Sequence, residues 1–292
     1  MTSVDIIYRY CDDDTAIRPL PADSSAALLR LEQGNRSFAR LLDHDETSGG
    51  IQQIVPVDLH DLGFVAGSSQ VPKQRPFAAI LGCSDARVPV ELLFNEGPND
   101  LFVVRVAGNG LGTEVLGSLK YAIENLGDSL RLIVALGHSG CGALTTAVDV
   151  FLSPGDYLPL ATKHTLRGIL DRSLLAVQTS ARKLQAVFGP DVVTSPGYRK
   201  ALIEVSIATN AALAAYSIQE ELRSSELAGI QAVYGVYLLE TRQIWAPRID
   251  GPDGDGLAAA PRNLAGFVEL GEAIVKSQRI KALLDAGIDS AP

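Results

Sequence analysis

The sequence predicts an α/β fold, with a central, mostly parallel sheet flanked by helices, an N-terminal helical arm and an extra C-terminal helix. Short apolar runs alternate along the chain with stretches that carry apolar residues at helical spacing, a pattern typical of βαβ units. Hydrophobic residues make up 47% of the 292 residues and charged residues 20%. This composition predicts a folded chain with a sizeable core.

The chain up to residue 76 is expected to contain one regular element. Residues 1–25 are acidic and predict an irregular tail. The following residues place apolar side chains at helical spacing, which predicts a helix over about 24–43. Glycine, proline and serine punctuate residues 44–76, so we expect a long surface loop there.

Four apolar runs predict the strands of the parallel sheet, because each is short and bounded by turn residues. These runs are Phe77–Leu81, Leu101–Val106, Leu130–Leu136 and Ile230–Leu239. The helices expected between them are Pro89–Phe94, Thr113–Asn125, 163–188 and 197–224. Beyond the last strand, residues 246–262 have the composition of a linker, and helical periodicity returns over Asn263–Leu284.

Charge and apolar run length argue against two classes of protein. The 25 Lys and Arg against 34 Asp and Glu give a net charge of −9, whereas a nucleic-acid binder needs a basic face. The longest apolar runs are far shorter than the roughly 20 residues that a membrane-spanning helix needs. The N-terminus also lacks the features of a secretory signal. We therefore expect a cytoplasmic protein that binds neither nucleic acid nor membrane.

Three polar sequences follow the first three expected strands. They are Gly82–Arg87, Ala107–Gly110 and Gly137–Gly142. Ligands of open parallel sheets bind at the carboxyl ends of the strands, where loops leave the sheet. We therefore expect the functional site at this edge.

Cys83, His138 and Cys141 offer two thiolates and an imidazole, which Zn²⁺ prefers in tetrahedral sites. If a helix begins near Ser139, the last two lie together at its N-terminus, where the helix dipole favours a thiolate. Three protein ligands leave a fourth position for water or substrate, which marks a catalytic zinc site. The alternative is that the cysteines are small buried hydrophobic residues and the histidine a structural loop residue.

Asp85 and Arg87 stand two residues apart, close to the first of these cysteines. Charged residues rarely lie at the buried end of a sheet unless they are paired or serve a site. Asp85 could be the fourth zinc ligand, or it could accept a forked hydrogen bond from Arg87 and leave the metal open to water. An ordinary structural salt bridge is the simpler alternative.

Taken together, Cys83–Arg87, Val104–Asn109 and His138–Gly142 resemble the motifs of the β-class carbonic anhydrases. Leu31–Phe38 resembles the N-terminal helix of that family, and Gly235–Tyr237 begins a stretch that resembles its late strand and turn. The resemblance divides the chain into four expected parts. These are an irregular tail at 1–25, a catalytic domain at 26–246, a linker at 247–262 and a helical C-terminal extension at 263–292.

The resemblance also implies a function. One Zn²⁺ per subunit would be bound by Cys83, His138 and Cys141, with Asp85 and Arg87 as a catalytic dyad. The implied enzyme is a carbonic anhydrase, which hydrates CO₂ reversibly to bicarbonate and a proton by means of zinc-bound hydroxide. Asp85 would be a fourth ligand only in a closed form. The implied assembly is a homodimer or a multiple of one, in line with a mean hydropathy of +0.16.

Two alternatives keep the same zinc. The first is hydrolysis of carbonyl sulfide or carbon disulfide, linear molecules that the same hydroxide could attack. The second is a non-catalytic zinc-bearing interaction protein in which Asp85 is permanently ligated. Some closed members of the family hold inhibitory bicarbonate with a tryptophan near the first cysteine. The only tryptophan here, Trp245, is remote in sequence, so we expect the open form.

A pH profile tests this interpretation. Two thiolates cancel the double charge of Zn²⁺, so the bound water should be less acidic than in a site of three histidines. We therefore expect CO₂ hydration to rise above neutral pH in stopped-flow assays between about pH 6 and 9, on protein of known zinc content. Flat activity across that window would contradict the hypothesis.

Overall fold

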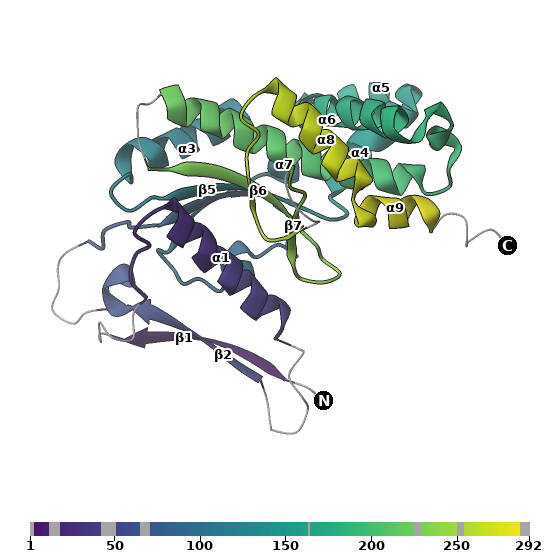
Figure 1. Cartoon of the computed structure of the whole chain (residues 1–292). Coiled ribbons are helices and arrows are strands. Elements are labelled where there is room, and N and C mark those ends of the chain that lie inside the picture. The colour runs from purple at the N-terminus through teal and green to yellow at the C-terminus, as the bar shows by residue number, and fades with distance from the viewer. Residues whose placement is uncertain are drawn as a thin grey trace.

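The computed structural model describes residues 3–11, 18–41, 51–64, 71–162, 164–224, 229–249 and 254–286. Within these residues the main body is a seven-stranded sheet with the order β4-β3-β5-β6-β7-β8, and β9 pairs with β6. Neighbouring strands from β4 to β6 run parallel, whereas β7, β8 and β9 pair antiparallel. The expected fold class, with its mostly parallel sheet, is confirmed (Figure 1).

The four parallel strands of this sheet lie close to the ranges that the sequence predicts, whereas its antiparallel strands were not predicted. The parallel strands are β3 (Ala78–Gly82), β4 (Leu101–Arg105), β5 (Leu132–His138) and β6 (Gln231–Tyr237). The antiparallel strands are β7 (Ile244–Ala246), β8 (Gly254–Asp255) and β9 (Ala258–Ala259). Every residue of β3 and β5 is buried, because helices cover both faces of these strands.

Two apolar clusters attach the helices to the opposite faces of the sheet. On one face lie α1 (Ser24–Ala39) and α2 (Val90–Phe94). The other face carries α3 (Thr113–Asn125), α4 (Gly142–Leu152), α6 (His164–Phe188), α7 (Tyr198–Ser224), α8 (Leu264–Lys276) and α9 (Gln278–Asp285). The short helix α5 (Tyr157–Ala161) connects α4 to α6. Figure 1 shows α1 below the sheet and the larger helical layer above it.

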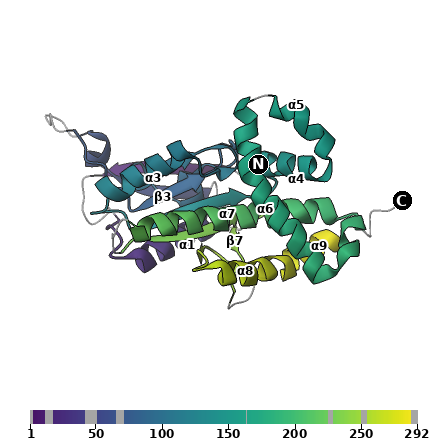
Figure 2. The same cartoon turned by 90° about the horizontal axis from the view of Figure 1, so that it is seen from above.

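Within the described part of the chain, one helix, α7, is long and apolar enough to cross a membrane by length and composition alone. The lengths of the apolar runs in the sequence predict no such segment. Of its most apolar window, 78% is buried inside the protein. In Figure 2, α7 runs across the middle of the molecule, between the side that carries α3 and the side that carries α8. Its apolar character therefore matches that of a core helix.

The N-terminal segment departs from the prediction. Strand β1 (Val4–Cys11) pairs in parallel with β2 (Ile51–Asp58) as a separate two-stranded sheet, and a 3-10 helix, η1 (Leu59–Leu62), follows. The expectation of an irregular tail at 1–25 is therefore wrong for Val4–Cys11. The expectation of an unbroken loop at 44–76 is wrong for Ile51–Asp58. Pro56 and the glycines around it indicate a loop, but Pro56 lies within β2, which pairs with a single strand, β1, among the described residues.

The C-terminal segment also differs from expectation. Part of the expected linker at 247–262 forms β8 and β9, which pair with β7 and β6 and so belong to the main sheet. The single helix expected over Asn263–Leu284 is two helices. Ser277 divides them, because its backbone is non-helical and its hydroxyl accepts the Ile280 N–H at 3.3 Å, which caps α9.

Close packing of α1 on α2 yields a testable prediction. A Cβ added at Gly34 would lie 1.7 Å from the backbone oxygen of Phe94, so the two helices would have to move apart. We expect Gly34→Ala to lower the free energy of unfolding by about 1–3 kcal/mol in urea denaturation. Gly117→Ala on α3 is the matched control, because its added Cβ meets nothing within 4 Å. Equal stability of the two variants would contradict the prediction.

Candidate metal centre

The three residues expected to bind metal meet at the carboxyl ends of β3 and β5. Cys83 directly follows β3, His138 ends β5, and Cys141 is the N-cap of α4. Their ligand atoms all lie within 4.8 Å of one another, and all three residues are buried. Because β3 and β5 are parallel neighbours, residues remote in sequence arrive at the same edge of the sheet.

A tight turn brings His138 and Cys141 together. Gly140 has a φ of +63°, in the left-handed region that favours glycine. The Ser139 N–H donates to Tyr237 O at 2.9 Å and holds the turn on β6. Helix α4 begins at Gly142 and not near Ser139. Cys141 is therefore its N-cap residue and directly precedes the first turn.

The imidazole of His138 has one partnered nitrogen and one free nitrogen. Nδ1 lies 3.0 Å from Ser139 O, a geometry in which Nδ1 carries the proton and donates it to the carbonyl. Nε2 is buried and has no hydrogen-bond partner among the described residues. A buried nitrogen with a free lone pair calls for an explanation, and a metal ligand supplies one. The donor set therefore fits Zn²⁺.

The two buried thiols interact directly. The hydrogen bond from the Cys141 thiol lowers the pKa of Cys83, and the Gly108 N–H, 3.4 Å from Cys83 Sγ, acts in the same direction. The same contact with Cys83, together with burial, raises the pKa of Cys141. Two thiolates this close together would repel each other unless a cation lay between them. A divalent cation could supply that charge and contact both sulfurs as thiolates.

Asp85 lies beside this cluster and is held by Arg87. Asp85 Oδ1 accepts from Arg87 Nε at 3.0 Å, and Oδ2 accepts from Nη2 at 2.7 Å. These hydrogen bonds hold the pKa of Asp85 well below its usual range. Oδ2 also lies 3.8 Å from His138 Nε2. The forked hydrogen bond considered for Asp85 and Arg87 is thus present, as it also would be in an ordinary structural salt bridge.

Some residues that shape the site have no role assigned from the sequence. Arg105 donates from Nε to Cys83 O at 3.0 Å and from Nη2 to Asp85 O at 2.6 Å, which fixes the backbone after β3. Glu204 accepts from the Gly140 N–H at 3.0 Å. A sequence signal did exist for Glu204, because an acidic residue within an apolar helix is unusual unless it has a partner.

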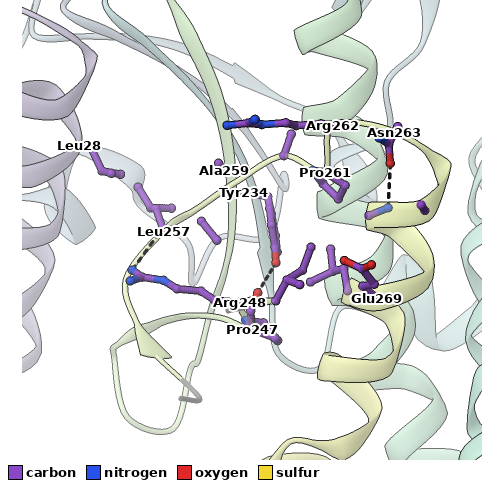
Figure 3. A pocket seen from close by; sticks show the side chains of 16 residues that line it. Leu28, Tyr234, Pro247, Arg248, Leu257, Ala259, Pro261, Arg262, Asn263 and Glu269 are labelled. Atoms are coloured by element: carbon purple, nitrogen blue, oxygen red, sulfur yellow. Dashed lines mark hydrogen bonds between the residues drawn. The ribbon is translucent and has the colours of Figure 1, made fainter. Parts of the chain in front are cut away.

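A cavity of about 800 Å³ lies away from this cluster, between β6, the segment after β7 and α8. Figure 3 shows Tyr234, Arg248, Arg262 and Glu269 around it. None of the five site residues predicted from the sequence lines this cavity. This cavity is therefore separate from the cluster of predicted site residues at the ends of β3 and β5.

The comparisons with known proteins match carbonic anhydrases. Residues 78–238 match the family model described as carbonic anhydrase. Carbonic anhydrase 2 of Mycobacterium tuberculosis is 39% identical over 137 residues, which cover 46% of this chain and 58% of the relative. Carbonic anhydrase of Mycolicibacterium smegmatis is 46% identical over 87 residues, which cover 30% of this chain and 41% of the relative. The chain thus spans less than two thirds of the length of these relatives.

Among solved structures, one similar fold is described as one of two tetrameric β-carbonic anhydrases from the filamentous ascomycete Sordaria macrospora. It has a TM-score of 0.41 and 19% identity, and the match covers 59% of this chain and 80% of that one.

The turn at Gly140 gives a prediction about the metal-free protein. An added Cβ there meets nothing within 4 Å, so Gly140→Ala acts through backbone strain alone. We expect it to lower the free energy of unfolding by about 1–2 kcal/mol. Gly142→Ala is the control, because that position has the same space without a positive φ. Chemical denaturation of both variants checks the prediction, and an equal loss in both would refute it.

Proposed function

This chain belongs to the β-class carbonic anhydrase family, whose model matches residues 78–238, and we propose that it is a zinc-dependent carbonic anhydrase. Its reaction would be the reversible hydration of CO₂ to bicarbonate and a proton. The observation that carries the proposal is the buried cluster of Cys83, His138 and Cys141 next to the Asp85–Arg87 pair.

Cys83, His138 and Cys141 would hold one zinc ion per subunit. His138 is suited to this role because its protonated Nδ1 faces Ser139 O, which leaves Nε2 as the donor atom. When bound, zinc supplies Lewis acidity that makes water nucleophilic near neutral pH.

Asp85 would orient the reacting water. Its Oδ2 is the oxygen that lies 3.8 Å from His138 Nε2, and it would accept a hydrogen bond from that water. Arg87 would keep Asp85 ionised and hold the carboxylate in the fork, away from a ligand position. This arrangement supports the open form of the site.

The alternatives expected from the sequence gain no specific support. No feature of the described residues favours carbonyl sulfide or carbon disulfide over CO₂. A non-catalytic protein with a permanently ligated Asp85 would need that carboxylate on the metal, whereas both of its oxygens accept hydrogen bonds from Arg87. We therefore retain CO₂ hydration as the proposal.

We also propose a homodimer, or a multiple of one, located in the cytoplasm. Large apolar side chains exposed on α5, α6 and α8 support association, with Leu158 72%, Leu175 61% and Leu264 79% exposed. The three cysteines are free, as is usual in a reducing compartment. Light scattering of the purified chain would report the mass of the assembly.

Substitution of Asp85 tests the proposed reaction. Asp85→Ala should retain zinc and lose CO₂ hydration by about 100-fold or more, because the water loses its acceptor. Stopped-flow hydration rates together with metal analysis measure both quantities. Asp156→Ala, an exposed position on the 3-10 helix η3 (Pro154–Asp156), is the control and should keep the rate. A zinc-loaded wild-type protein without turnover would overturn the proposal.

A further inference from the structure

The turn between His138 and Cys141 is held from outside by two carboxylates. The Gly140 N–H donates to Glu204 Oε1 at 3.0 Å, and Ser139 Oγ donates to Glu240 Oε2 at 2.8 Å. Ser139 Oγ in turn accepts the Leu239 N–H at 2.9 Å. Both residues that separate the two expected ligands therefore donate a hydrogen bond to an acidic side chain.

Arg279 on α9 joins these two acids. Its Nη2 donates to Glu204 Oε2 at 2.8 Å and its Nη1 donates to Glu240 Oε1 at 2.5 Å. The side chains of Arg279 and Glu204 are only 21% and 10% exposed. A planar guanidinium can hold two separate carboxylates at once, which an ammonium group does less well.

Glu204 needs this partner because of where it lies. It belongs to α7, between the buried residues Ile203 and Val205. A buried carboxylate without a cation would lose more in desolvation than it gains from a single backbone hydrogen bond. Arg279 thus supplies an opposite charge to the same carboxylate that accepts the Gly140 N–H.

We propose that Arg279 is a positioning residue that holds the turn from His138 to Cys141 in its metal-binding geometry. Arg279 reaches His138 through two intermediate residues. Arg279 binds Glu240, Glu240 accepts the hydroxyl of Ser139, and the carbonyl of Ser139 faces Nδ1 of His138. Arg279 lies outside the matched range 78–238, so this role belongs to the C-terminal extension. The inference rests on the proposed zinc site.

Helix α9 has other attachments, so loss of Arg279 need not release it. Ile280 is fully buried, and Leu284 is buried as well. A Cβ at Gly197 would lie 2.1 Å from the Leu283 oxygen, which shows how closely α9 packs on the segment before α7. These contacts allow the effect of Arg279 on the metal to be separated from the docking of its helix.

Zinc affinity of the metal-free protein, measured by competition with a chromophoric chelator, tests the proposal. Arg279→Ala should weaken zinc binding about 10-fold or more, as loss of such supporting contacts does in other sites. Arg279→Lys should recover part of the affinity, because an ammonium can hold one of the two acids. Lys281→Ala, at an exposed position of the same helix, should bind zinc like the wild type.

A second readout reports the ligand geometry directly. In the Co²⁺-substituted protein, Arg279→Ala should shift the visible absorption of the cobalt site, and Lys281→Ala should not. Unchanged affinity and an unchanged cobalt spectrum, with only a lower melting temperature, would show that Arg279 merely docks α9 and would overturn the inference. A wild-type protein that does not bind zinc would instead contradict the proposed function.

Glu240→Gln keeps the proposal testable if Arg279→Ala does not fold. The Glu240 side chain is 49% exposed, so the protein should tolerate the change. This variant should also weaken zinc binding, and combining it with Arg279→Lys should cost less than the sum of the two changes, because both act through one network. Wild-type affinity in Glu240→Gln would overturn the inference independently.

Discussion

The parallel pairing of β3 with β5 is the constraint on which the rest of the site depends. It places the carboxyl ends of both strands at one edge of the sheet, so that Cys83 and His138 meet there. A shift of either strand by one residue would turn its buried side chains to the opposite face. The register of the sheet therefore positions the two halves of the site, and the following turns only refine that position.

Two arginines that are not candidate metal ligands contact these two halves in a similar way. Arg105 donates to the backbone of Cys83 and Asp85, whereas Arg279 donates to Glu204 and Glu240, which contact the second half. In each case one guanidinium joins two acceptors that belong to different residues. A delocalised cation with several donors in one plane is suited to such a bridge, and it fixes backbone geometry without itself facing the ligand atoms.

The parallel strands and the cysteine–histidine cluster could be predicted because their signals are local. Apolar runs define β3 and β5, and the candidate ligand residues follow or end these strands. The pairing of β1 with β2 could not, because each strand is marginal alone and gains stability only from a partner remote in sequence. The contact of Arg279 with Glu204 could not be predicted for the same reason, because the sequence pattern of α9 does not show that Glu204 lies opposite it.

The position of Arg279 in the chain has a consequence for the order of assembly. Synthesis proceeds from the N-terminus, so β3, β5 and α4 leave the ribosome well before α9 does. The cluster of Cys83, His138 and Cys141 can therefore form in a nascent chain in which Arg279 has not yet been synthesised. With Arg279 as proposed, a nascent chain would hold zinc loosely at first and reach its final affinity only after α9 has docked.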